Sequence, residues 1–295
     1  MGNATWSAGA YRATAATLST QSRAEIFKQS TIKSEFDPRM VVLRESCDSQ
    51  ANPNSNAIII GLDVTGSMGI IAEKIAKKGL GTLVEGILDR KPVSDPHIMI
   101  MAIGDVFCDR APLQVTQFEA DIRIAEQLTD LWLEGGGGGN TFESYDLPWA
   151  FASRKTKIDC FDKRGKKGYL FTIGDENPPQ VSVNRVKLNE SIGAGGQGDS
   201  TTEQLLSEAQ ERYNVFHIVV EQGNFASRAL PTVSKNWNDL LGKKAIHLND
   251  YDCIAEVILS VIEVNEGKDP QEVIDSWDTA KIKSAVEYSL FGGGQ

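Results

Sequence analysis

The hydrophobic pattern changes at about residue 57, after which short unbroken apolar segments alternate with longer segments of helical periodicity. Unbroken apolar runs of this length are typical of central parallel strands, because such strands are covered on both faces. The runs occupy residues 57–62, 97–103, 169–173, 215–220 and 245–248. Residues 114–118 can return beside the second run as an antiparallel edge strand.

Apolar residues at helical spacing fill most of the intervals between these runs. The predicted helices cover residues 69–88, 120–133, 142–154, 201–213 and 252–264. Strands that alternate with helices require crossover connections, which favour parallel pairing. We therefore expect an α/β fold: a doubly wound, mostly parallel central sheet with helices on both faces and one antiparallel edge strand.

The same pattern predicts three parts of the chain. Residues 1–55 contain no long apolar run and are predicted to form an N-terminal extension, with a helix near 21–28 and a strand near 40–44. Residues 56–266 form the principal domain, and residues 267–295 form a C-terminal helical tail.

Polar loops follow three of the predicted strands, after Leu62, Ile103 and Ile173. In open parallel sheets, the loops at the carboxyl ends of the strands carry function. The first loop reads Asp63-Val64-Thr65-Gly66-Ser67, so three side-chain oxygens alternate along it. These are hard donors, which suit Mg²⁺ or Ca²⁺ better than zinc or copper. Taken alone, the loop is equally compatible with a helix cap.

Two further residues can join this loop at the same edge of the sheet. A run of five glycines ends at Asn140-Thr141, and Asp175 follows the strand that ends at Ile173. A glycine run alone is more often a linker, and Asp175 alone a turn residue. Their joint occurrence with the Asp63 loop, each after the proper element, indicates a cation site.

With these residues in this order, residues 57–265 resemble the von Willebrand factor A family. The resemblance rests on the segment DVTGSM at residues 63–68 and implies a metal-ion-dependent adhesion site made of Asp63, Thr65, Ser67, Thr141 and Asp175. It implies a bound Mg²⁺, with Mn²⁺ or Ca²⁺ as alternatives, that captures an Asp or Glu carboxylate of a partner protein. The family often has Gly after the last Asp, whereas this chain has Glu176.

Other acidic residues near these loops are predicted to have ordinary roles. Asp105 is expected to be a turn residue that binds nearby amides; the alternatives are a place behind the metal ligands, in contact with them, or a place on the binding rim. Glu134 and Glu143 flank the glycine run and are expected to be exposed charges.

Charge and composition exclude several classes of partner. A net charge of −10 argues against nucleic acid, whose phosphates require clustered Lys and Arg. No apolar run reaches the roughly 18 residues of a membrane span, so no membrane association is expected. The four cysteines form no close pair, which predicts reduced thiols in a cytoplasmic protein.

Three classes of function stay open. We favour a non-catalytic protein-binding module, an adaptor or scaffold subunit. The resemblance to the von Willebrand factor A family implies an AAA+ ATPase as a partner in trans, and the chain has no nucleotide-binding GxxxxGK[ST] motif of its own. The alternatives are an Mg²⁺-dependent hydrolase or phosphotransferase and a self-assembling structural protein. Against the enzyme, the selected loops contain no histidine that could act as a general base.

Overall fold

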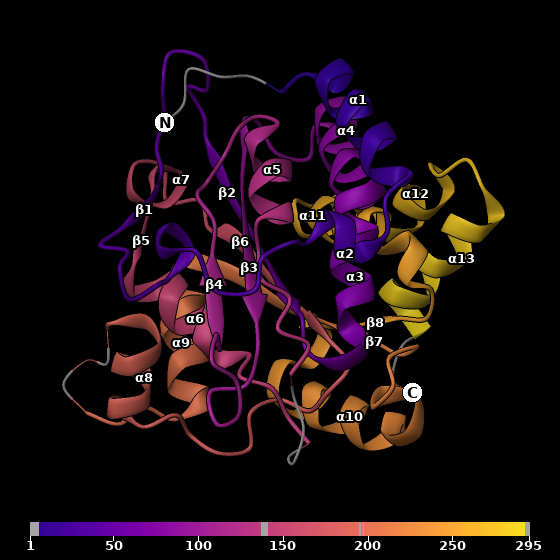
Figure 1. Ribbon diagram of the computed structural model, residues 1–295. Helices are drawn as coiled ribbons and strands as arrows, with labels where there is room; N and C mark the ends of the chain where they lie inside the picture. Colours follow the sequence, from indigo (N-terminus) through magenta and orange to yellow (C-terminus); the bar gives the residue numbers. More distant parts are fainter. Residues whose placement is uncertain (1–5, 137–140, 195, 197, 293–295) are drawn as a thin grey trace.

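The structure is a computed structural model that describes residues 6–136, 141–194, 196 and 198–292, apart from the side chains of Ala8, Ser67 and Ala76. A six-stranded sheet runs through it (Figure 1). In spatial order its strands are β4 (Leu113–Val115), β3 (Pro96–Ile103), β2 (Asn56–Asp63), β6 (Gly168–Gly174), β7 (Tyr213–Val220) and β8 (Ala245–Leu248). All neighbours pair in parallel except β3 and β4, which are antiparallel. The expected mostly parallel sheet with one antiparallel edge strand is confirmed.

Alternating residues of β2 divide the apolar interior into two cores. Ile58, Ile60 and Leu62 face one core, whereas Ala57 and Ile59 face the other, as the two-residue period of a strand requires. Every residue of β2 is buried, which explains why its sequence is an unbroken apolar run rather than an alternating one.

Helices cover both faces of the sheet, as expected. The first core is closed by α1 (Ala8–Ser19), α2 (Arg23–Ile26), α3 (Gly69–Lys74), α4 (Leu80–Arg90), α5 (Arg123–Thr129), α11 (Ile254–Asn265), α12 (Pro270–Asp275) and α13 (Ala280–Glu287). The second core is closed by α6 (Asp146–Arg154), α7 (Asp159–Asp162), α8 (Arg185–Ile192), α9 (Thr202–Arg212) and α10 (Ala226–Leu241). Figure 1 shows α1, α3 and α4 on one side of the sheet and α6, α8 and α9 on the other.

The helix predicted over residues 69–88 contains one turn of different geometry. Residues Ile75–Gly79 form a π-helical segment between α3 and α4. Helix α1 packs against this segment and against the first turn of α4, so closely that a Cβ added to Gly81 of α4 would lie 1.8 Å from the Tyr11 ring. Glycine at position 81 therefore allows α1 to approach α4.

The N-terminal extension is joined to the rest of the chain by hydrogen bonds as well as by apolar contacts. Strand β1 (Arg44–Ser46) pairs in parallel with β5 (Thr156–Ile158) in a separate two-stranded sheet. Beside it, the buried Lys155 ammonium donates to the carbonyls of Pro38 and Val41, at 2.9 and 2.6 Å. The domain boundaries at residues 55 and 266 stay predictions.

The order of the strands in the sheet identifies one position on its edge. Chain order runs outward in one direction from β2 through β3 to β4, and then in the other from β6 through β7 to β8. The reversal falls between the neighbouring strands β2 and β6. In doubly wound sheets, ligands bind in the crevice beyond the carboxyl ends of the strands at such a switch point. Asp63 ends β2, and Asp175 directly follows β6.

Candidate functional site

Asp63 is fully buried at the end of β2, where three donors face its carboxylate. Its Oδ1 atom accepts hydrogen bonds from the backbone N–H and the hydroxyl of Thr65, at 2.8 and 2.6 Å. Its Oδ2 atom accepts one from the Tyr145 hydroxyl, at 2.9 Å. Burial and, to a smaller extent, the charge of Asp175 raise the pKa of Asp63 to about 7, against the lowering effect of the hydrogen bonds from Thr65 and Tyr145.

The loop after Asp63 turns sharply and is fixed to the glycine run. Gly66 has a φ of +41°, a conformation that favours glycine. Its N–H donates to the Gly136 carbonyl at 2.9 Å. The backbone of Ser67 lies in the short 3₁₀ turn Gly66–Met68, whereas its side chain lies outside the described part of the chain. The two predicted loops therefore lie side by side.

Thr141 and Asp175 lie at the same edge but face different surroundings. Thr141 is exposed, and its carbonyl accepts hydrogen bonds from the backbone and side chain of Asn177, at 3.3 and 2.8 Å. Asp175 is buried, and its Oδ2 atom accepts from the Phe225 N–H at the start of α10, at 2.8 Å. Burial raises the pKa of Asp175, although this hydrogen bond lowers it. The structure thus brings Asp63 and Thr65 into contact and places Asp175 near enough to repel Asp63.

Glu143 contradicts the sequence prediction of an exposed charge, since it is only 1% exposed. Its Oε2 atom has no hydrogen-bond partner among the described residues. Burial and then the charges of Asp63 and Glu176 raise its pKa to about 10. The Glu143 side chain turns inward toward other carboxylates, whereas a sequence pattern alone treats a polar residue beside a glycine run as exposed.

Glu176 and Asp105 complete the acidic group. Burial raises the pKa of Glu176 to about 7, and Asp63 contributes to the increase. Asp105 is fully buried and accepts from the Phe107 N–H at 2.9 Å, the turn role expected for it. Glu134, also expected to be exposed, has a side chain that is 14% exposed and accepts from the Arg110 and Ala111 N–H groups.

An aromatic cluster forms the floor beneath Asp63. The Tyr145 ring packs edge-on against His217 and Trp237, with centroid distances of 4.8 and 5.4 Å. His217 stacks on Trp237 at 3.5 Å, and Trp237 donates to the Glu176 carbonyl at 2.8 Å. The sequence did not predict Tyr145 as a site residue, because Tyr145 and Asp63 are far apart in sequence and only the tertiary structure brings them into contact. The cluster joins the site to α10.

The donors at this edge match a hard divalent cation in chemistry and in charge. They are carboxylates and hydroxyls, and the charge of Asp63 helps to raise the pKa of both Glu143 and Glu176, a repulsion that a cation would relieve. Within the described ranges, no three His, Cys, Asp or Glu side chains form a group arranged to hold a metal ion. A cation here would therefore depend on hydroxyl and water oxygens beside Asp63.

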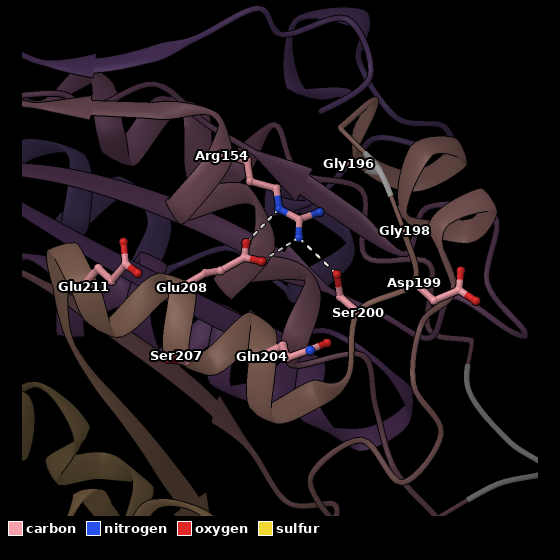
Figure 2. Close-up of a pocket in the computed structure, with 9 residues that line it drawn as sticks. All are labelled: Arg154, Gly196, Gly198, Asp199, Ser200, Gln204, Ser207, Glu208 and Glu211. Atoms are coloured by element: carbon pink, nitrogen blue, oxygen red, sulfur yellow. Dashed lines mark hydrogen bonds and ion pairs between the residues drawn. The ribbon is translucent and has the colours of Figure 1, made fainter.

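A separate hollow of about 680 Å³ lies beside the glycine-rich loop that precedes α9 (Figure 2). The Arg154 guanidinium at its wall forms two hydrogen bonds with the Glu208 carboxylate, at 2.8 and 2.9 Å. It also donates to the Ala194 carbonyl at 3.0 Å and to the Ser200 hydroxyl at 3.2 Å. Since oxygen atoms of the protein already accept hydrogen bonds from the Arg154 guanidinium, Arg154 has a structural role: it links the loop to α6 and α9.

We expect Arg154→Gln to lower the free energy of unfolding by about 1–3 kcal/mol, because the change removes charged hydrogen bonds and leaves the Glu208 and Ala194 oxygens less well satisfied. Urea denaturation measures the change. Arg228→Gln, at an exposed arginine of α10, is the matched control and should change stability little. Equal stability of the two variants would show that the loop does not depend on Arg154.

No protein-family model matches the chain, and no curated protein matches it. Among solved structures, it is similar to the open conformation of the pilus adhesin SpaC from Lactobacillus rhamnosus GG. The identity is 12% and the TM-score 0.44, over 77% of this chain and 31% of that one. It is also similar to a von Willebrand factor type A structure from Catenulispora acidiphila, with 17% identity and a TM-score of 0.40, over 73% of this chain and 44% of that one. The match spans less than half of either structure.

A last observation concerns the length of the helices. Among the residues that the structure describes, none of the helices combines the length and the apolar character needed to cross a membrane.

Proposed function

We propose that this chain is a protein-binding module of the von Willebrand factor A type, in which a divalent cation at Asp63 captures a carboxylate of a partner protein. The observation that carries the proposal is the position of Asp63. A buried carboxylate followed by the hydroxyl-bearing loop 64–67 stands at the switch point of a doubly wound sheet, with Asp175 at the neighbouring strand end.

The chain's own residues define which oxygens would hold the ion. Asp63, Thr65, Ser67, Thr141 and Asp175 would bind it directly or through water, and Mg²⁺ is our first choice, with Mn²⁺ or Ca²⁺ as alternatives. When bound, the ion supplies an open coordination position for a carboxylate. Thr65 orients Asp63 through its hydroxyl, and Tyr145 holds the other carboxylate oxygen.

The charge state of the site supports capture of an anion. Burial and the charges of Asp63 and Glu176 raise the pKa of Glu143 to about 10, which favours the neutral form of this carboxyl beside the site. A divalent ion beside Asp63, neutral hydroxyls and a more distant Asp175 would keep part of its positive charge. That residual charge favours an Asp or Glu side chain of a partner. We propose no catalytic role for the site. The candidate partners are an AAA+ ATPase acting in trans and a second copy of this chain.

Cation binding tests the site itself. Isothermal titration calorimetry with MgCl₂, MnCl₂ and CaCl₂ should show binding to the wild-type protein and none to Asp63→Ala. Thr65→Ala should bind more weakly than wild type but more tightly than Asp63→Ala, because it removes a neutral oxygen rather than the principal anion. The reverse order of the two variants would contradict the ligand roles proposed here.

Partner capture tests the function. Affinity purification from native extract should retain partners in MgCl₂ and lose them in EDTA or with Asp63→Ala as bait. Partners retained in all three conditions would overturn cation-dependent docking. Mg²⁺-dependent turnover of a generic phosphatase substrate that disappears in Asp63→Ala would overturn the assignment as a binding module in favour of an enzyme.

A further inference from the structure

An aromatic pair marks one side of the rim around the acidic site. The loop after β3 lies against the segment after the glycine run: the Ser144 N–H donates to the Gly104 carbonyl at 3.3 Å, and the Val106 N–H donates to the Ser144 hydroxyl at 2.9 Å. At this junction the rings of Phe107 and Phe142 meet edge to face, with their centroids 6.1 Å apart. Phe142 lies between Thr141 and Glu143, so the pair adjoins the proposed cation site.

Phe107 is exposed but well supported. Phe107 is 39% exposed, whereas Phe142 is buried. The Phe107 N–H is held by Asp105, and the ring contacts Phe142 on one side and the Lys187 ammonium, 4.7 Å from the ring centroid, on another. A ring that is already positioned loses little conformational entropy when a partner packs on it. Phe107 therefore has the properties of a binding contact rather than of a core residue.

Lys187 on α8 adds a positive charge beside this ring. Its ammonium donates to the Val106 carbonyl at 3.2 Å. In the part of the chain that the structure describes, Lys187 has no ion pair with a carboxylate, although the neighbouring loops contain Asp105, Asp109 and Glu143. Its charge is therefore available to an anionic group that approaches along the rim.

We propose that the partner of this module presents an acidic, aromatic peptide segment. One carboxylate of the segment binds the cation, an aromatic side chain packs on Phe107, and a second carboxylate pairs with Lys187. This inference rests on the proposed function and specifies the chemistry of the partner. A mixed polar and aromatic contact of this kind matches the composition of protein interfaces, in which aromatic residues supply contact area and charges supply selectivity.

A peptide array tests the inference without knowledge of the natural partner. The probe is a set of immobilised hexapeptides with one fixed Asp and randomised flanking positions, overlaid with the labelled full chain in MgCl₂. The wild-type protein should prefer peptides with an aromatic residue and a second Asp or Glu near the fixed Asp. Phe107→Ser should lose about three- to ten-fold for the aromatic peptides. Lys187→Gln should lose about two- to five-fold for the doubly acidic ones.

Matched control variants distinguish an effect of the rim residues Phe107 and Lys187 from a general effect of changing the protein surface. Val42→Ser replaces an apolar side chain that is 90% exposed on the N-terminal extension, and Lys157→Gln replaces a half-exposed lysine of β5. Both controls should keep the wild-type preferences. The inference is overturned if the wild type shows no aromatic or acidic preference, or if Phe107→Ser and Lys187→Gln keep it. If peptide binding in EDTA, or by Asp63→Ala, equals that of the wild type in MgCl₂, the proposed cation-dependent function is wrong. The inference about the partner, which rests on it, is then wrong as well.

Discussion

At pH 8 and without divalent cations, Asp63→Asn is expected to be more stable than the wild-type protein by about 2–4 kcal/mol, although it binds no Mg²⁺. The change removes a fully buried charge that is repelled by Asp175, while the shape and hydrogen bonds of the side chain are kept. An asparagine Oδ1 atom can accept from Thr65, and its amide can donate to the Tyr145 oxygen, since a hydroxyl can also accept. Thermal denaturation in EDTA measures the gain.

The same group makes the stability of the cation-free protein depend on pH in a defined direction. The pKa of Asp63 rises from 3.8 in an ordinary environment to about 7 in the folded protein, so the folded state holds this proton more tightly. The cost of ionising Asp63 in the folded protein is absent below about pH 4, increases as the pH rises toward 7, and is complete above 7. Its full size is on the order of 4 kcal/mol. Acidification from pH 8 to pH 6 should therefore raise the melting temperature, and Glu176 contributes in the same sense.

Two comparisons make this prediction specific. Asp63→Asn should flatten the pH dependence and abolish the rise in melting temperature caused by MgCl₂, whereas Asp89→Asn, at an exposed residue of α4, should change neither. An Asp63→Asn protein that is less stable than the wild type in EDTA at pH 8 would show that the carboxylate is stabilised by its donors without a cation.

Gly174→Ala is expected to lower the free energy of unfolding by about 3 kcal/mol or more, the upper part of the range for overpacking. A Cβ at position 174 would lie 1.9 Å from the Tyr145 hydroxyl oxygen and 2.6 Å from the ring carbon that bears it. Tyr145 cannot yield cheaply, because its buried ring is packed against His217 and Trp237. Its displacement would also break the hydrogen bond to Asp63, so cation binding should weaken in calorimetry.

A double-mutant cycle identifies the clash as the cause. Tyr145→Leu removes the ring edge that meets the new methyl group, so Gly174→Ala should cost clearly less in the Tyr145→Leu protein than in the wild type. Gly198→Ala is the control, since a Cβ there would meet nothing within 4 Å. Additive effects of the two changes would contradict the proposed contact.

The central sheet could be predicted from the sequence, because each strand is buried on both faces and therefore appears as an apolar run. Residues 57–62 and 169–173 both lie inside observed strands, and the antiparallel return near residue 114 was also predicted. Local sequence determines this part of the fold, since few other structures bury such runs completely.

Helix α10 and strand β5 were missed for different reasons. Helix α10 contains Pro231, a residue that argues against a continuous helix in the sequence, and the structure has a kink at Ala229 just before it. Strand β5 spans three residues and pairs with β1, more than a hundred residues earlier in the chain. No local periodicity indicates a pairing of that kind.

Part of the candidate site could also be predicted from the sequence, and part of it could not. The loop containing Asp63 and Thr65 has a recognisable local pattern, and its position after an apolar strand indicated the sheet edge. Glu143 and Tyr145 have no such pattern, because their burial depends on the fold of the segment after the glycine run. Their closeness to Thr141 in sequence was the only available signal.

The attachment of the N-terminal extension also has a consequence for the order of events during synthesis. The carbonyls of Pro38 and Val41 meet the Lys155 ammonium across separations of 117 and 114 residues. The extension is translated before its partners, so this contact and the β1–β5 pairing cannot form until β2, β3, β4 and then β5 have been translated. Such distant contacts slow folding, so the apolar side chains of Phe27 and Phe36, which are buried in the folded protein, stay exposed to water for longer during synthesis.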